Sequence, residues 1–152
     1  MVWAMFSWST LGPIIPIEQS LTSGRYVNMV ADQVHPFMAT VFLAGDGVYQ
    51  QDNAPCHKGR IVMDWFEEHS SDFQVMSWPP NSPDMNPIEN LWSYLENQIR
   101  AATLPPRNVR ELQDQLVSAW YQIPQTTYQH LVESMPRRVR AVLRAKGGPT
   151  SY

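Results

Sequence analysis

The sequence predicts an α/β fold whose centre alternates strand and helix and whose C-terminal part is helical. Short apolar runs rich in β-formers occur at residues 48–51 and 73–77, and helix-periodic segments follow them at 58–69 and 87–99. This alternation is typical of an α/β unit with parallel strands. After residue 104 three helical segments follow one another without a strand. A chain of 152 residues buries about two-thirds of its unfolded surface when it folds.

The N-terminal segment is predicted to form a hairpin followed by a helix. Residues 2–8 and 13–18 are apolar, and turn-forming residues lie between them. Residue 22 or 23 is a suitable helix cap, and the helix is expected to run to about His35, because Pro36 does not support a helix around it. The predicted buried face of this helix consists of Tyr26, Val27, Val30 and Val34.

The C-terminal part, residues 104–152, is predicted to contain three helices. Asn108 is a good cap for the first of them. Pro124 separates the first helix from a second, expected near 126–133, and residues 135–136 are expected to start a third helix near 137–146.

Composition excludes several classes of protein. Hydrophobic residues at 43% and aromatic residues at 11% exclude a disordered chain. No apolar run reaches the roughly 20 residues that cross a bilayer, so no membrane partner is expected. The apolar opening, residues 1–6, follows no positive residue and is predicted to be a strand rather than a signal peptide. The lone Cys56 permits no internal disulfide and fits a reducing compartment.

The net charge of −3 conceals a division between the two ends of the chain. Residues 1–99 contain three Lys and Arg against eleven Asp and Glu, a net charge of −8, whereas residues 100–152 contain eight against three, a net charge of +5. An acidic half could bind a divalent cation, and a basic tail could contact phosphate. Ordinary solvated surface explains the same charges.

The stretch at residues 77–92 contains four prolines and leads into a helix that opens with Pro87. Proline suits the first turn of a helix, and Asn86 before it is a good N-cap. Glu89 lies in the first turn, away from the apolar stripe of the helix, where the helix dipole favours a negative charge. The stretch therefore delivers one carboxylate at a defined place.

Asp52 is the second acidic residue at a suggestive position, because it ends a predicted strand, where open α/β sheets usually bind ligands. One helix and one strand lie between Asp52 and Glu89, enough to return the second carboxylate to the first. Such a pair could hold Mg²⁺ or Mn²⁺, which prefer oxygen ligands. The alternative is structural: Asp52 as a turn residue and Glu89 as a favourable first-turn acid.

Other polar residues have both functional and structural interpretations. His57 could bind metal or activate water, or it could simply begin a helix. The cluster of Arg137, Arg138 and Arg140 could contact DNA phosphates or form a solvated face.

Two long motifs resemble those of a known family. The stretches VYQQDNAPCH (residues 48–57) and WPPNSPDMNPIENLW (residues 78–92) resemble the catalytic domain of the mariner superfamily of DDE transposases. The opening MVWAMFS (residues 1–7) is similar to the third-strand segment of that family, and short segments between residues 123 and 148 are similar to its closing region. The resemblance therefore covers essentially the whole chain.

The resemblance implies an RNase H-like fold with a mixed central sheet flanked by helices. Residues 1–103 would form a partial DDE catalytic domain and residues 104–152 a helical extension packed on it. It also implies three acidic residues that bind two Mg²⁺ or Mn²⁺ ions for DNA cleavage and strand transfer, with Asp52 as the second acid and Glu89 as the third. The residues implied to orient these carboxylates are Asn53, Asn86 and His57.

The sequence departs from the family pattern at its start. The first Asp of the family lies some tens of residues before the segment that resembles residues 1–7. Asp32 falls in a predicted helix and Asp46 in a turn, so neither matches it. We therefore expect the chain to be inactive or incomplete on its own. Without an initial strand, an open sheet edge would invite pairing with another chain, and a homodimer is one such outcome.

The resemblance implies DNA as the partner, no small-molecule substrate, and a nuclear location, with the cytoplasm as the alternative. Two alternatives stay open. The chain could be a non-enzymatic DNA- or protein-binding module that uses its basic tail or its open sheet edge. It could also be a stand-alone metal-dependent nuclease that works with Asp52 and Glu89 alone.

Overall fold

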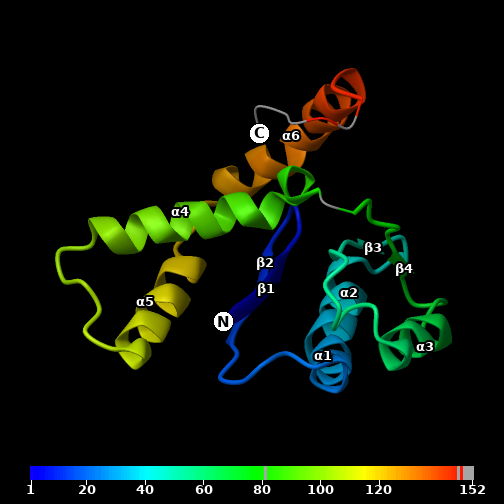
Figure 1. The fold of residues 1–152 in the computed structure, drawn as a ribbon, viewed down its shortest axis with the longest axis horizontal. Coiled ribbons are helices and arrows are strands. Elements are labelled where there is room, and N and C mark those ends of the chain that lie inside the picture. The colour runs from blue at the N-terminus through cyan, green and yellow to red at the C-terminus, as the bar shows by residue number, and fades with distance from the viewer. Residues whose placement is uncertain (81, 147, 149–152) are drawn as a thin grey trace. The chain divides into compact units, whose positions relative to one another are not determined.

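The computed structural model describes residues 1–80, 82–146 and 148. Helices and strands alternate through the centre of the chain, and the C-terminal part is helical, as predicted (Figure 1). No helix within these residues has the length and apolar character required to cross a membrane.

The chain divides into two compact units. The first unit contains residue 1 and residues 17–81, and the second contains residues 2–16 and 82–152. This division differs from the predicted boundary after residue 103, because the N-terminal hairpin and the helix that begins at Pro87 pack with the C-terminal helices. How residues 104–152 extend a catalytic domain stays a prediction.

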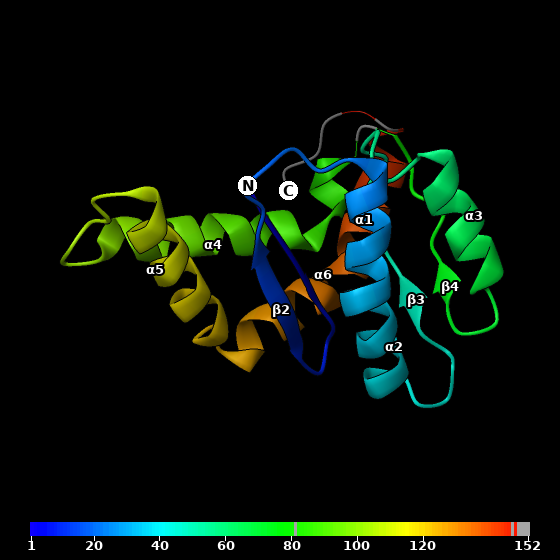
Figure 2. The same ribbon diagram turned by 90° about the horizontal axis from the view of Figure 1, so that it is seen from below.

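The first unit begins with one continuous helical rod of three parts: α1 (Ser23–Met29), a π-helical turn η1 (Val30–Val34) and α2 (His35–Val41) (Figure 2). The prediction that Pro36 ends the helix is wrong. The amide of His35 bonds the carbonyl five residues earlier, which widens the turn just before the proline. The wider turn relieves the crowding between a proline ring and the carbonyl four residues before it.

A parallel strand pair follows this rod, as predicted. Strand β3 (Val48–Tyr49) pairs with β4 (Gln74–Val75), and α3 (Arg60–Glu68) makes the crossover between them (Figure 2). Both strands are shorter than the apolar runs that predicted them. The side chains of Tyr49, Phe66 and Phe73 meet beneath the pair, with ring centroids 6.1 to 6.4 Å apart.

Helix α3 approaches α1 through a glycine. Gly59 is the N-cap of α3 and lies against Ser23, the first residue of α1. A Cβ atom at Gly59 would lie 2.6 Å from the Cβ of Ser23, closer than two carbon atoms can approach. The absence of a side chain at Gly59 therefore sets the distance between the two helix ends.

The second unit is built on the N-terminal hairpin of β1 (Val2–Phe6) and β2 (Leu11–Pro16), which pair antiparallel as predicted. Helix α4 (Pro87–Ala101) follows a short 3₁₀ turn, η2 (Pro83–Met85). Pro87, Leu91 and Leu95 form the buried side of α4. The predicted helix start and apolar stripe are thus confirmed.

Two further helices complete the second unit. Asn108 caps α5 (Val109–Tyr121), and its side-chain oxygen accepts a 2.9 Å hydrogen bond from the amide of Glu111. The indole of Trp120 is fully buried and donates a 2.9 Å hydrogen bond to the carbonyl of Gly12, which fixes α5 to the hairpin. The buried residues of this core are Ala4, Ile14, Leu91, Leu95, Trp120, Ile123 and Tyr128.

Helix α6 (Gln125–Arg144) is continuous, so the prediction of two helices separated at Pro136 is wrong. Hydrogen bonds on either side bridge the proline. The hydroxyl of Ser134 donates to the carbonyl of Leu131 at 2.6 Å and accepts from Nε of Arg138 at 2.8 Å. Ser134 and Arg138 are both buried. These contacts stabilise the helix where proline removes one backbone donor.

The close approach at Gly59 predicts a stability defect that a second substitution repairs. Gly59→Ala should lower the free energy of unfolding by about 1–3 kcal/mol, because the new methyl group overpacks against Ser23. Ser23→Gly in the same chain should restore most of the loss. Urea titrations of the single and double variants measure both effects.

Gly24→Ala is the matched control. A Cβ at Gly24 would lie 3.9 Å from the side chain of Ile61, an ordinary contact, so this helical substitution should be neutral or stabilising. An equal loss in Gly59→Ala and Gly24→Ala would contradict the assigned role of Gly59.

Candidate active site

The loop after β3 holds the carboxylate of Asp52 by one of its two oxygens. Oδ1 accepts a hydrogen bond from the backbone amide of Ala54 at 2.9 Å and lies 2.7 Å from Nδ1 of His57. Nδ1 of His57 also forms a 3.4 Å hydrogen bond with the backbone carbonyl of Asp52. Oδ2 has no partner among the residues that the structure describes, and the side chain is 48% exposed. The carboxylate is therefore fixed in orientation while one oxygen remains available.

His57 is held firmly although it lies in a loop. Its side chain is 13% exposed, and its ring lies on the ring of Tyr26 with centroids 4.0 Å apart and planes inclined by 30°. A carbonyl oxygen and an ionised carboxylate only accept hydrogen bonds, and Nδ1 of His57 faces one of each, so Nδ1 carries the proton. That assignment leaves Nε2 as the other ring nitrogen, pointing away from Asp52.

Tyr26 and Tyr49 form a buried pair of phenols beneath this loop. The hydroxyl of Tyr26 lies 3.1 Å from that of Tyr49 and donates to Oε1 of Gln51 at 2.5 Å. Burial raises the pKa of Tyr49 to about 12, assisted by the charge of Asp52 and opposed by the hydrogen bond to Tyr26. Burial, together with Tyr49 and the charge of Asp52, raises the pKa of Tyr26 well above its ordinary value. Both phenols therefore stay neutral.

The first of the two sequence motifs is bonded to the start of the second. Nδ2 of Asn53 donates a 2.9 Å hydrogen bond to the carbonyl of Trp78. The bond ties the loop of Asp52 to the segment after β4, within the first unit. Asn53 therefore supports the loop through the backbone of residue 78.

Glu89 and Asn86 belong to the second unit. Glu89 lies in the first turn of α4 with its side chain exposed, as predicted. Asn86 occupies the N-cap, where its carbonyl accepts from the amide of Glu89 at 3.1 Å, and its side chain makes no capping hydrogen bond. The structure thus groups Asp52, Asn53 and His57 around one loop and places Glu89 on a rigid helix.

The three predicted phosphate-contacting arginines do not share one environment. Arg137 and Arg140 are exposed on α6. Arg138 is 3% exposed and bonds to Ser134, so it serves the fold of the helix rather than its surface. Phosphate contact by Arg137 and Arg140 stays a prediction.

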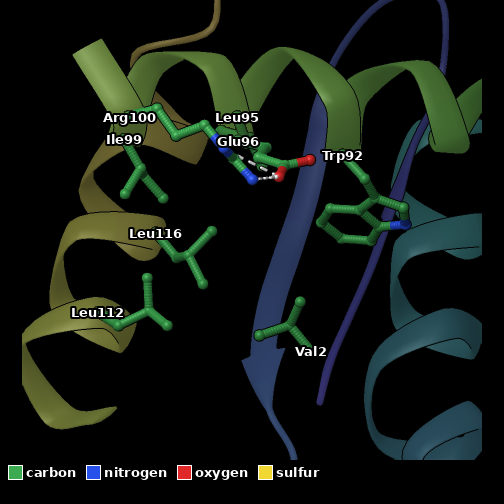
Figure 3. Close-up of a pocket in the computed structure, with 8 residues that line it drawn as sticks. All are labelled: Val2, Trp92, Leu95, Glu96, Ile99, Arg100, Leu112 and Leu116. Carbon is green, nitrogen blue, oxygen red and sulfur yellow. Dashed lines mark hydrogen bonds and ion pairs between the residues drawn. The ribbon is translucent and has the colours of Figure 1, made fainter. Parts of the chain in front are cut away.

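Within the described part of the chain, no three His, Cys, Asp or Glu side chains are grouped so that they could hold a metal ion. A separate apolar hollow of about 360 Å³ lies in the second unit between α4, α5 and β1 (Figure 3). None of the predicted site residues lines it. Its polar contribution is the ion pair of Glu96 with Arg100, at 2.6 Å. The candidate active site is therefore the loop of Asp52 and not this hollow.

Sequence reasoning missed three residues of the site: Tyr26, Tyr49 and Gln51. Tyr26 was predicted only as part of a buried helix face, which is correct for its burial. Gln51 is adjacent to Asp52 in the first motif, and this position is the one sequence feature that could have identified it as a site residue. The stacking of Tyr26 on His57 joins residues far apart in sequence, so no local pattern reports it.

Comparison with known proteins points to the same region. The family described as DDE superfamily endonuclease matches residues 28–113, a range that contains both Asp52 and Glu89. The transposable element Tcb1 transposase of Caenorhabditis briggsae is 38% identical over 152 residues, which is 100% of this chain and 54% of that protein. The chain therefore spans about half the length of this curated relative.

Solved structures agree on the fold. The catalytic domain of Mos1 mariner transposase matches with a TM-score of 0.83 at 15% identity, over 99% of this chain and 75% of that one. The Mos1 mariner paired end complex with Mn matches with a TM-score of 0.81 at 16% identity, over 97% and 44%. The predicted RNase H-like α/β fold is thereby confirmed.

The buried phenols predict a late tyrosine titration. Because the pKa of Tyr49 is raised above the ordinary value of about 10, to about 12, its contribution to stability is present below about pH 10 and is lost as the pH rises through about 12. Ultraviolet absorbance of tyrosinate should show part of the six tyrosines ionising late, and Tyr49→Phe should remove one of the late groups. Ionisation of all six together near pH 10, while circular dichroism still reports a folded chain, would contradict this.

Proposed function

Because the chain belongs to the DDE superfamily of endonucleases, in its Tc1/mariner group of transposases, we propose that it supplies Asp52 and Glu89 as metal ligands for the cleavage and transfer of DNA strands. The carboxylate of Asp52 carries this proposal. It is fixed through Oδ1 and available through Oδ2, in the loop that follows the parallel strand β3. Ligands of α/β sheets usually bind at such strand ends.

The donor set fits a hard divalent cation. Carboxylate oxygens are the ligands that Mg²⁺ and Mn²⁺ prefer, and both proposed ligands have exposed or half-exposed side chains. Asp52 offers one oxygen because His57 and the amide of Ala54 occupy the other. When bound, such an ion activates the attacking oxygen and stabilises the leaving oxygen in phosphodiester displacement.

Glu89 is positioned by helix packing rather than by side-chain hydrogen bonds. The buried side chains of Leu91 and Leu95 fix the rotation of α4, so the first-turn carboxylate always points to the same side of the helix. We assign Asn53 to the support of the Asp52 loop through Trp78. We assign Asn86 to the N-cap of α4, where it fixes the backbone that leads into the first turn and Glu89.

DNA is the proposed substrate. The described end of α6 exposes Arg137 and Arg140 on one helix, and exposed arginines provide the phosphate contacts that dominate DNA affinity. One of the matching solved structures is the Mos1 mariner paired end complex with Mn. Because DNA is the proposed substrate, the nucleus is the proposed location. A homodimer is also proposed and has to be tested.

Catalysis by these 152 residues alone is proposed to be absent or severely reduced. The family resemblance implies three acidic ligands, and the residues of this chain that match it are Asp52 and Glu89. A second candidate function, a DNA-binding module without cleavage, is favoured by the exposed arginines of α6. Metal binding and DNA nicking separate the two.

The first test measures Mn²⁺ binding by isothermal titration calorimetry. We expect Asp52→Asn to weaken binding by more than about tenfold, because it removes the charge of a ligand. Glu89→Gln should weaken it as well. Asp32→Asn, an exposed acid on the helical rod, is the matched control and should leave binding unchanged.

The same variants are then assayed for Mn²⁺-dependent nicking of supercoiled DNA. The expected result is no nicking by the chain alone. Nicking that is lost in both Asp52→Asn and Glu89→Gln would instead establish a stand-alone nuclease. Equal Mn²⁺ affinity in wild type and Asp52→Asn would overturn the proposed metal site.

The second test concerns DNA binding. Arg137→Gln and Arg140→Gln should each weaken binding to a labelled duplex and reduce the slope of affinity against salt by about one unit, if each arginine neutralises one phosphate. Fluorescence anisotropy at several salt concentrations measures both quantities. Arg60→Gln, an exposed arginine on α3, is the control. Identical salt slopes in all variants would remove α6 from the proposed DNA interface.

A further inference from the structure

We propose that Tyr26 is a positioning residue for Asp52, acting through the ring of His57. The inference rests on the proposed function of Asp52 as a metal ligand. Nothing in the sequence motifs assigns Tyr26 to the site, because it lies on α1, well before the first motif.

Tyr26 contacts the Asp52 loop on both sides of the carboxylate. Before Asp52, the hydroxyl of Tyr26 donates to Gln51 at 2.5 Å and lies 3.1 Å from the hydroxyl of Tyr49. After Asp52, the ring of Tyr26 supports His57 at a centroid distance of 4.0 Å. One side chain from α1 therefore fixes both ends of the short segment that carries the acid.

Packing alone does not account for this arrangement. A buried phenol costs free energy unless its hydroxyl is bonded, and Tyr26 is fully buried. A phenylalanine would fill the same space without that requirement. The hydroxyl instead bonds the residue adjacent to Asp52, and the charge of Asp52 in turn raises the pKa of Tyr26. Tyr26 and the carboxylate are thus coupled electrostatically as well as sterically.

The ring of Tyr26 determines what His57 can do. The two rings are in contact, with planes inclined by 30°, so His57 cannot tilt further into the space that Tyr26 fills. Its Nδ1 then stays 2.7 Å from Oδ1 of Asp52. If His57 turned away, only the amide of Ala54 would remain on Oδ1, and the carboxylate would be held less firmly. The contact between the two rings therefore helps the amide of Ala54 to keep Oδ1 occupied and Oδ2 available.

Two substitutions separate the role of the Tyr26 ring from that of its hydroxyl. Tyr26→Phe keeps the ring under His57 and removes only the bonds to Tyr49 and Gln51. Tyr26→Leu removes the support itself. Positioning through the ring predicts that the leucine variant loses the function of the stack and that the phenylalanine variant retains it.

The first readout is the side chain of His57, followed by ¹⁵N NMR at one fixed pH, with His57→Asn used to assign its signals. Wild type and Tyr26→Phe should show His57 with the proton on Nδ1. Tyr26→Leu should show a mixture of the two tautomers. Phe66→Leu, a buried aromatic of the same unit that does not contact His57, is the matched control for lost packing and should match wild type.

The second readout is Mn²⁺ affinity without DNA. Tyr26→Leu should weaken Mn²⁺ binding by about 10–100-fold, the usual effect of removing a group that orients a metal ligand, whereas Phe66→Leu should not. In a His57→Asn background, which lacks the ring, Tyr26→Leu should have little further effect. That loss of additivity identifies His57 as the route from Tyr26 to Asp52.

A Tyr26→Leu chain whose His57 tautomer and Mn²⁺ affinity both equal those of Phe66→Leu would overturn the proposal. Should Tyr26→Leu fail to fold, a tautomer mixture in Tyr26→Phe would equally overturn it, since the ring is then not sufficient. Wild-type protein that binds no Mn²⁺ would overturn the proposed function of Asp52. The NMR readout still decides the role of Tyr26 in that case, so the two failures are distinguishable.

Discussion

The buried side chain of Tyr26 is the constraint on which the candidate site depends. A phenol with no access to water must find a partner inside the protein, and failure to do so costs about 1–3 kcal/mol. Tyr26 finds Gln51 and Tyr49 at the end of β3. These bonds, together with the contact of the Tyr26 ring with His57, hold α1 against the end of β3 and the loop that carries Asp52. The helical rod, the parallel pair and the loop after it are thereby held in one arrangement.

The two proposed metal ligands are fixed by different physical means. Asp52 lies on a loop, and loops hold a side chain in place only through specific bonds, here from Ala54 and His57. Glu89 lies on α4, whose buried leucines set the rotation of the whole helix. A loop residue needs support from outside its own segment, whereas a helical residue inherits support from the core. This difference explains why a residue as distant in sequence as Tyr26 supports Asp52, whereas Glu89 needs no such support.

Local sequence chemistry predicted the parts of the fold that local chemistry controls. Asn108 caps its helix, Pro87 opens another, and β3 pairs with β4 in parallel as the strand–helix–strand pattern indicated. Pro36 and Pro136 were misjudged because the rule that proline ends a helix ignores compensation. A π-helical turn absorbs Pro36, and the bonds of Ser134 bridge Pro136. The motif located Asp52 and His57, but their support by Tyr26 depends on tertiary contacts that no spacing encodes.

The partners around Asp52 bear on its chemistry. Among the described residues no Lys or Arg pairs with this carboxylate, although Lys58 follows the loop directly. A guanidinium at Oδ1 would neutralise the acid and compete with a metal ion for its charge. An imidazole can donate from Nδ1 without carrying a positive charge, and the two phenols nearby stay protonated because their pKa values are raised. The loop thus orients the carboxylate while leaving its negative charge for a cation, which is the combination that a ligand of Mg²⁺ or Mn²⁺ requires.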